Sequence, residues 1–180
     1  MSPSRILLPL LLFIAACGNE TPVTETTVTE TPVAAVAMPD TYAAQVAETI
    51  LENGGNAVDA SIAAAFSLAV TKPDAGNIGG GGFMLVHLDG ASNFIDYRET
   101  APRLAHRDMY LDENGDPVEN ASLIGHRAAG IPGTVAGMWV AHELYGTMPW
   151  ADLLAPAIEL ARDGFVVHPL QAEEIEEKLE

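Results

Sequence analysis

The stretch ILENGGNAVDASIAAAFSLAV, residues 50–70, contains the pattern that decides the fold. Asn56 followed three residues later by Asp59 is typical of a capping box, in which two side chains satisfy the free amides at the start of a helix. The helix that follows is rich in alanine and apolar on nearly every side, so we expect it to be buried among close neighbours. Gly54 should end a preceding helix. Two adjacent helices are therefore the expected core.

The rest of the sequence predicts further helices and a β-hairpin. The first helix should begin with Asp40 or Thr41 as its N-cap, and its apolar residues lie on one stripe. The other predicted elements are strands over residues 83–88 and 93–97, helices over 132–146 and 151–164 with the second interrupted at Pro156, and an acidic helical pattern over 170–180. This order predicts an α+β fold. Two strands alone are too few for a stable sheet, so the fold is expected to be incomplete.

Composition limits the classes of function. The chain has 180 residues, enough for one domain with a core, and 48% of them are hydrophobic, which argues against disorder throughout. The formal net charge of −17 argues against binding to nucleic acid or to an anionic membrane through a basic face. A single cysteine excludes an intramolecular disulfide framework, and no Cys/His cluster has the spacing of a zinc site. We expect no metal and no cofactor.

The N-terminal residues have the features of an exported lipoprotein. Arg5 precedes an apolar run over residues 6–16 that is too short to span a bilayer, and small residues precede Cys17. The stretch IAAC that ends at this cysteine resembles the bacterial lipobox, in which the cysteine is lipidated. We therefore predict a signal peptide at residues 1–16, and a lipidated cysteine with a flexible tether at residues 17–38. The predicted location is the periplasmic or cell-surface side, with a lipid anchor in the (outer) membrane.

Several short motifs suggest binding chemistry but are incomplete. The glycines at residues 79–82 follow a helix and precede a strand, the reverse of a phosphate-binding loop, so we expect them to allow close backbone packing and positive φ angles. The stretch DENGDP, from Asp112, lacks the glycine and glutamate of a calcium loop and predicts a turn. His142 and Glu143 begin a zinc-protease pattern in which Gly146 replaces the second histidine. The residues themselves contain no complete catalytic site.

Arg98, in DYRETAP at residues 96–102, is the candidate binding residue. It follows a mostly apolar strand, which places a guanidinium near the end of the sheet. Two interpretations remain open from the residues alone. Arg98 could form a salt bridge with Asp96, Glu99 or Asp108, which composition favours, or it could hold a ligand that is not protein.

Four stretches of the chain resemble one known family. They are ILENGGNAVDASIAAAFSLAVTKPDAGNIGGGGFMLV, DYRETAP, RDMYLDENG and GIPGTVAGMWVAHELYGTMPWADLLAPAIELARDGF. In this order they are similar to the N-terminal, large-subunit region of the γ-glutamyltransferases. The resemblance as a whole runs from about residue 40 to residue 167. The resemblance implies part of the αββα sandwich of N-terminal-nucleophile hydrolases. It also implies a precursor that cleaves itself before a threonine, which then attacks the γ-glutamyl bond of glutathione and related compounds. Water, an amino acid or a peptide accepts the glutamyl group.

The resemblance assigns a role to few residues of this chain. It implies that Arg98 binds the α-carboxylate of the donor through two hydrogen bonds. The threonine nucleophile lies downstream of the matched stretches in the family, so no catalytic residue is assigned. We expect residues 39–180 to be a truncated N-terminal part of the large subunit, inactive without the small subunit of the same precursor. The alternatives are a surface lipoprotein that uses this half-domain for binding or structure, and a related acylase with another γ-linked donor.

Overall fold

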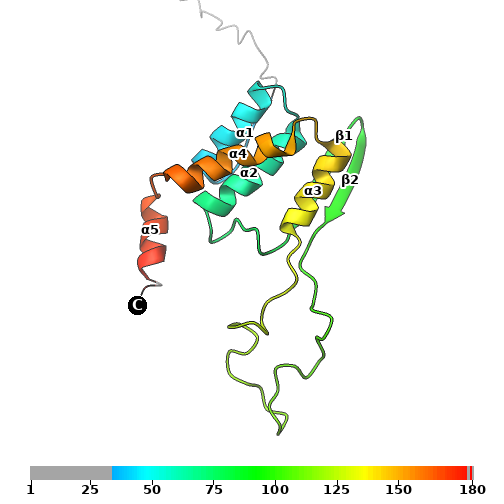
Figure 1. The fold of residues 1–180 in the computed structure, drawn as a ribbon, viewed down its shortest axis with the longest axis vertical. Coiled ribbons are helices and arrows are strands. Elements are labelled where there is room, and N and C mark those ends of the chain that lie inside the picture. The colour runs from blue at the N-terminus through cyan, green and yellow to red at the C-terminus, as the bar shows by residue number, and fades with distance from the viewer. Residues whose placement is uncertain (1–33, 178, 180) are drawn as a thin grey trace, which may run out of the picture. The chain divides into compact units, whose positions relative to one another are not determined.

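The structure, a computed structural model, describes residues 34–177 and 179 of the chain. A helical pair is followed by a hairpin and three more helices (Figure 1). The elements are α1 (Thr41–Glu52), α2 (Ala57–Thr71), β1 (Phe83–Leu88), β2 (Ala91–Asp96), α3 (Thr134–Tyr145), α4 (Trp150–Asp163) and α5 (Pro169–Glu176). None of these helices combines the length and apolar character that crossing a bilayer requires. Cys17 and the signal peptide predicted at residues 1–16 lie outside the described residues.

The first two helices begin as the sequence predicts. Asn56 Oδ1 accepts hydrogen bonds from the amides of Val58 at 2.8 Å and Asp59 at 3.0 Å, and Asn56 N donates to Asp59 Oδ2 at 3.0 Å. These contacts complete the capping box of α2. At the start of α1, Asp40 Oδ1 accepts a hydrogen bond from Ala43 N at 2.7 Å, so Asp40 is the N-cap. Local capping chemistry therefore sets both helix starts.

Helix α2 lies at the centre of the core. It contacts α1, α3 and α4 (Figure 1), and the side chain of Ile62 in α2 is fully buried. Leu153 of α4 belongs to the same buried cluster. Val36 and Met38, at the end of the segment predicted to be a tether, are half-buried against this cluster. The small alanine side chains of α2 allow neighbouring helices to approach closely. The predicted burial among close neighbours is confirmed for most of the helix, although Ala57 and Ser61 are exposed.

Helix α4 continues through Pro156, where the sequence predicts an interruption. That prediction is wrong. An internal proline removes one backbone hydrogen bond and crowds the preceding turn, which favours a break in an isolated segment. Leu153 and Ala157, on either side of the proline, are both buried, and α4 packs along α2. Tertiary packing therefore offsets the local cost of the proline.

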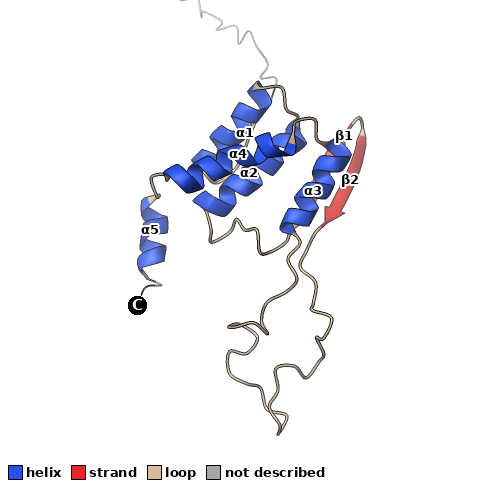
Figure 2. Cartoon of the chain, viewed as in Figure 1, coloured by secondary structure: helices blue, strands red, loops and turns tan. Residues whose placement is uncertain are grey.

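The hairpin lies beside α3 (Figure 2). It presents one apolar face to the core and another away from it. Its strands pair antiparallel, with Asp89 (φ 51°) and Gly90 (φ 77°) in the turn. The inner side chains are Met84, Val86, Leu88 and Ile95. The outer apolar side chains are Phe83, Leu85 and Phe94, with exposed fractions of 52%, 73% and 63%. Strand β2 begins at Ala91 and ends at Asp96, close to the predicted range of 93–97. Helices together with this hairpin make the described part of the chain an α+β structure, as predicted.

Candidate functional site

Arg98 lies just after β2, in a segment whose backbone is held on both sides. Before it, Tyr97 N donates to Gly82 O at 3.1 Å and Gly82 N donates to Tyr97 O at 3.4 Å, which extends the hairpin by one pair. After it, Thr100 N donates to Ile131 O at 3.2 Å, and Ile131 N donates to Thr100 O at 2.8 Å. The main chain of residue 98 is therefore anchored between two paired neighbours.

The Arg98 side chain is exposed, and among the described residues its guanidinium forms neither an ion pair nor a hydrogen bond. Only its backbone amide contacts a neighbouring acid, donating to Asp96 Oδ1 at 3.0 Å. Asp108 is instead paired with Arg107 at 2.9 Å. Within the part of the chain that the structure describes, the salt bridge to Asp96, Glu99 or Asp108 is therefore not formed.

The glycines at residues 79–82 lie between the turn after α2 and strand β1, and Gly80 forms hydrogen bonds with the start of α3. Gly80 O accepts hydrogen bonds from Gly133 N at 2.7 Å and Thr134 N at 3.0 Å, so a backbone carbonyl caps α3. Asn77 Oδ1 accepts hydrogen bonds from Gly80 N at 2.9 Å and Thr134 Oγ1 at 2.7 Å. The predicted close backbone packing is confirmed. The predicted positive φ angles are wrong, because the described glycines with positive φ are 54, 90, 115, 125 and 164.

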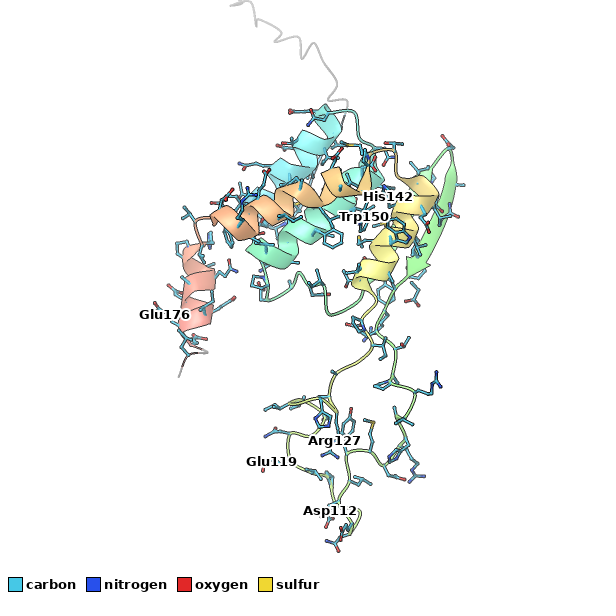
Figure 3. The ribbon with its side chains drawn as sticks, viewed as in Figure 1. Asp112, Glu119, Arg127, His142, Trp150 and Glu176 are labelled. Carbon is cyan, nitrogen blue, oxygen red and sulfur yellow. The ribbon has the colours of Figure 1, made fainter. Side chains whose placement is uncertain are left out.

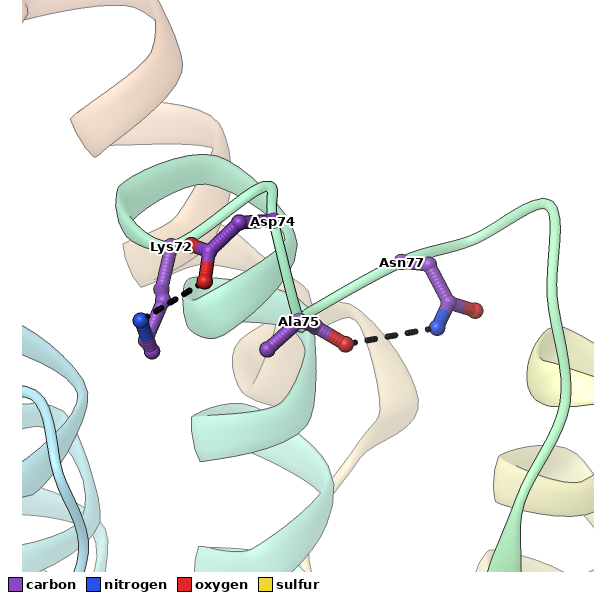
Figure 4. A network of polar contacts seen from close by, with 4 residues as sticks. All are labelled: Lys72, Asp74, Ala75 and Asn77. Atoms are coloured by element: carbon purple, nitrogen blue, oxygen red, sulfur yellow. Dashed lines mark hydrogen bonds and ion pairs between the residues drawn. The ribbon is translucent and has the colours of Figure 1, made fainter. Parts of the chain in front are cut away.

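The turn that leads from α2 to Asn77 contains its own polar contacts (Figure 4). Lys72 Nζ donates to Asp74 Oδ2 at 2.8 Å, and Asn77 Nδ2 donates to Ala75 O at 3.5 Å. The hydrogen bond between the charged pair raises the pKa of Lys72 and lowers the pKa of Asp74. Because both side chains are partly exposed, the pair contributes little to stability. The pair lies at the start of the turn that follows α2.

Asp59 is a fully buried carboxylate (0% exposed) that connects α2 to the turn between α3 and α4. Its oxygens accept hydrogen bonds from Thr147 Oγ1 at 2.6 Å, Thr147 N at 3.0 Å and Met148 N at 3.4 Å, in addition to Asn56 N. Burial raises the pKa of this carboxyl, but the hydrogen bonds outweigh burial and leave the pKa below 3.8. The sequence predicts only the contact with Asn56; the contacts with Thr147 and Met148 join distant segments.

His142 is packed in an aromatic cluster, beside Trp150 (Figure 3). Its Nε2 is 2.8 Å from Met148 O, so Nε2 carries the proton in this contact. The ring centroid is 5.3 Å from that of Trp150 and 5.7 Å from that of Trp139. These contacts make His142 a packing residue.

The long connection between β2 and α3 carries polar residues on turns (Figure 3). Asp112 Oδ1 accepts hydrogen bonds from Asn114 N at 2.8 Å and Asp116 N at 2.9 Å, and these contacts lower the pKa of Asp112. The turn predicted for this stretch is therefore confirmed. No group of three or more His, Cys, Asp or Glu side chains within the described ranges is arranged to hold a metal ion.

Comparison with known proteins matches the same region of the chain. The family model described as Gamma-glutamyltranspeptidase matches residues 43–180. The glutathione hydrolase proenzyme of Pseudomonas aeruginosa is 59% identical over 133 residues, which cover 74% of this chain and 24% of that protein. The glutathione hydrolase proenzyme of Escherichia coli is 52% identical over 141 residues, covering 78% and 24%. The chain thus spans about a quarter of the length of the curated relatives that it matches.

A solved structure supports the same relationship. The γ-glutamyltranspeptidase from Pseudomonas nitroreducens complexed with L-DON matches with a TM-score of 0.79 and 53% identity, covering 83% of this chain and 45% of that one. This similarity confirms the α+β class and the expected part of the N-terminal-nucleophile hydrolase sandwich. Sequence, family model and fold agree over the segment that contains Arg98. The chain therefore belongs to the γ-glutamyltranspeptidase family.

Proposed function

We propose that this chain is the donor-binding part of an enzyme that hydrolyses or transfers the γ-glutamyl group of glutathione and related compounds. The observation that carries the proposal is the contrast between the backbone and the side chain of Arg98. Its backbone is anchored on both sides, whereas its guanidinium is exposed and unpaired among the described residues. A guanidinium presents two parallel donors that match a carboxylate, and a γ-glutamyl donor carries a free α-carboxylate. Membership of the family supports the same class of substrate.

The proposed reaction needs a nucleophile, which we assign to the part of the family's length that this chain does not span. A threonine hydroxyl, with its own α-amine as base, attacks the γ-carbonyl carbon. The carbon–nitrogen bond breaks, the departing amine takes up the proton, and water or a second amine then releases the glutamyl group from the ester. The task of Arg98 is to bind and orient the donor, because fixing the α-carboxylate also restricts where the γ-carbonyl can lie.

The test uses the full-length protein that carries this segment and two donors. One is a γ-glutamyl anilide, and the other is the same anilide with its α-carboxylate converted to an amide. We expect the amide donor to have a kcat/KM at least about 30-fold lower, because a charge-assisted pair contributes about 2 kcal/mol or more. The 180-residue chain alone is the control, and it should neither cleave itself nor release the anilide product. Equal rates with both donors would contradict carboxylate recognition, and no release from either would contradict the γ-glutamyl activity.

We also propose that the protein is lipid-anchored through Cys17. The support is the charged residue, short apolar run and IAAC stretch at the start of the chain. Cys17→Ala should move the protein from the membrane fraction to a soluble or unprocessed form, since acyl chains supply about 0.8 kcal/mol of membrane affinity per buried methylene. Ser4→Ala, outside the IAAC stretch, is the matched control and should fractionate as the wild type does. Identical fractionation of Cys17→Ala and the wild type would rule out the anchor.

A further inference from the structure

Four glycines from two separate segments lie against Tyr97 and Arg98: two face their main chain and two face the side chain of Tyr97. A Cβ on Gly81 would lie 2.6 Å from Tyr97 O and 2.9 Å from Arg98 C, closer than real Cβ atoms approach. A Cβ on Gly133 would overlap Tyr97 O, and one on Gly137 would overlap the Tyr97 ring and its Cβ. A Cβ on Gly82 would lie 2.9 Å from Tyr97 Cε2. We call Gly81, Gly82, Gly133 and Gly137 the glycine cradle.

Space, not backbone handedness, requires glycine at these positions. None of the cradle glycines has a positive φ, so another residue could adopt the same backbone conformation. What a side chain would meet is Tyr97, the residue immediately before Arg98. The Gly133 amide also donates to Gly80 O, which ties the two halves of the cradle together. The cradle therefore holds one short segment, the end of the hairpin.

The contacts of the Tyr97 ring fix the position of this residue. The ring is half-buried at the contact between β2 and α3, and its hydroxyl donates to Phe83 O at 3.3 Å. Burial raises the pKa of the phenol, so the group is present as the neutral donor. The ring rests over Gly137 because no side chain occupies that place. Alternate sides of an extended segment carry successive side chains, so a fixed Tyr97 fixes the direction in which Arg98 leaves the main chain.

We propose that Tyr97 and the glycine cradle are positioning elements that aim the Arg98 guanidinium at the donor carboxylate. The inference rests on the proposed function of Arg98 and adds the residues that set its geometry. Binding sites of this kind work only when the ligand-contacting group is held within about 0.5 Å of the productive position. An exposed arginine side chain has many rotamers. The fold can still fix the position of its Cα atom and the direction of its Cα–Cβ bond, through the main chain.

The experiment measures, in the full-length protein, the ratio of kcat/KM for the γ-glutamyl anilide to that for its α-amide. This ratio does not depend on the fraction of folded enzyme, so a purely structural defect leaves it unchanged. Gly137→Ala should lower the ratio about tenfold or more, because a displacement of about 1 Å can cost about 100-fold in rate. Gly79→Ala is the matched control: a Cβ there meets nothing within 4 Å, and the ratio should equal that of the wild type.

Tyr97→Ala keeps the test decisive if Gly137→Ala fails to fold. It deletes the ring without adding any atom to the cradle, and it should lower the ratio by a similar factor. An unchanged ratio in Tyr97→Ala, with a lower melting temperature, would overturn the positioning role. If the wild type itself fails to discriminate between the donors, both this inference and the proposed function are wrong. If Arg98→Gln abolishes the discrimination while Gly137→Ala and Tyr97→Ala keep it, only the positioning role is wrong.

Discussion

Replacing Asp59 with alanine is expected to lower the free energy of unfolding by about 2–4 kcal/mol. The side chain is fully buried and serves two connections at once. It completes the capping box of α2 through Asn56, and it holds the turn after α3 through Thr147 and Met148. Loss of a cap costs about 1 kcal/mol, and hydrogen bonds to a charged group contribute about 1.5–3 kcal/mol. The measurement is the shift in the urea midpoint of the chain, which, multiplied by a constant m-value, gives the change in the free energy of unfolding.

Two further variants help to interpret this loss: one separates the charge of Asp59 from its size, and the other is a control at an exposed acid. Asp59→Asn keeps the volume but removes the charge, so we expect a smaller loss of stability than with alanine. Asp74→Ala removes a partly exposed acid and should change the stability by no more than about 0.5 kcal/mol. Equal losses for Asp59→Ala and Asp74→Ala would show that the buried hydrogen bonds do not stabilise the fold.

The contribution of Asp59 should also depend on pH in a defined direction. Its pKa in the folded protein lies below the ordinary value of 3.8, so the unfolded chain binds the proton more readily. The stabilisation is therefore fully present above pH 3.8 and is lost as the pH falls through the lower, folded-state pKa. The difference in urea midpoint between the wild type and Asp59→Asn should narrow in that acidic range. A difference that stays constant would contradict the assigned pKa shift.

The parts of the fold that could be predicted from the sequence depend on local chemistry. Asn56 and Asp59 identify the start of α2 because a capping box is formed by residues three positions apart. The turn at Asp89–Gly90 is equally local. At Pro156 the local propensity predicts a break, whereas burial of α4 against α2 maintains the helix. Tertiary contacts decide such cases, and a single sequence does not reveal them.

The candidate site likewise has features that the sequence predicts and features that depend on tertiary contacts. The alternation of strand residues places Arg98 at the end of the hairpin, and the family resemblance supplies the reason to expect a carboxylate there. Whether Arg98 forms a salt bridge depends on side-chain geometry, so the residues alone left that choice open. The sequence indicates only part of the glycine cradle. The four consecutive glycines at 79–82 are an unusual run, but nothing in the sequence distinguishes Gly133 and Gly137 from other residues at the start and in the middle of a helix. Their contact with Tyr97 joins segments that are distant in the sequence.

Replacing Arg98 with glutamine in the full-length protein is expected to lower kcat/KM for a γ-glutamyl anilide by about 30-fold or more. The estimate uses about 2 kcal/mol, the lower end of the range for a desolvated charge pair, because Arg98 is exposed and solvent screens its charge. Arg98→Lys keeps the positive charge but loses the planar two-point contact, so it should retain attraction and lose orientation. The α-amide donor provides the decisive comparison. In Arg98→Gln the two donors should react at nearly equal rates, because neither can then form the charged pair.

Stability measurements distinguish this role from a structural one. The guanidinium has no ion-pair partner among the described residues, so Arg98→Gln should leave the melting temperature within the range of ordinary surface substitutions. Arg107→Gln is the matched control, since it removes an equally charged, exposed side chain that is paired with Asp108 in the connection before α3. It should alter neither KM nor the ratio between the donors. A lower melting temperature with an unchanged KM in Arg98→Gln would mean that Arg98 stabilises the protein through a salt bridge and does not hold the donor.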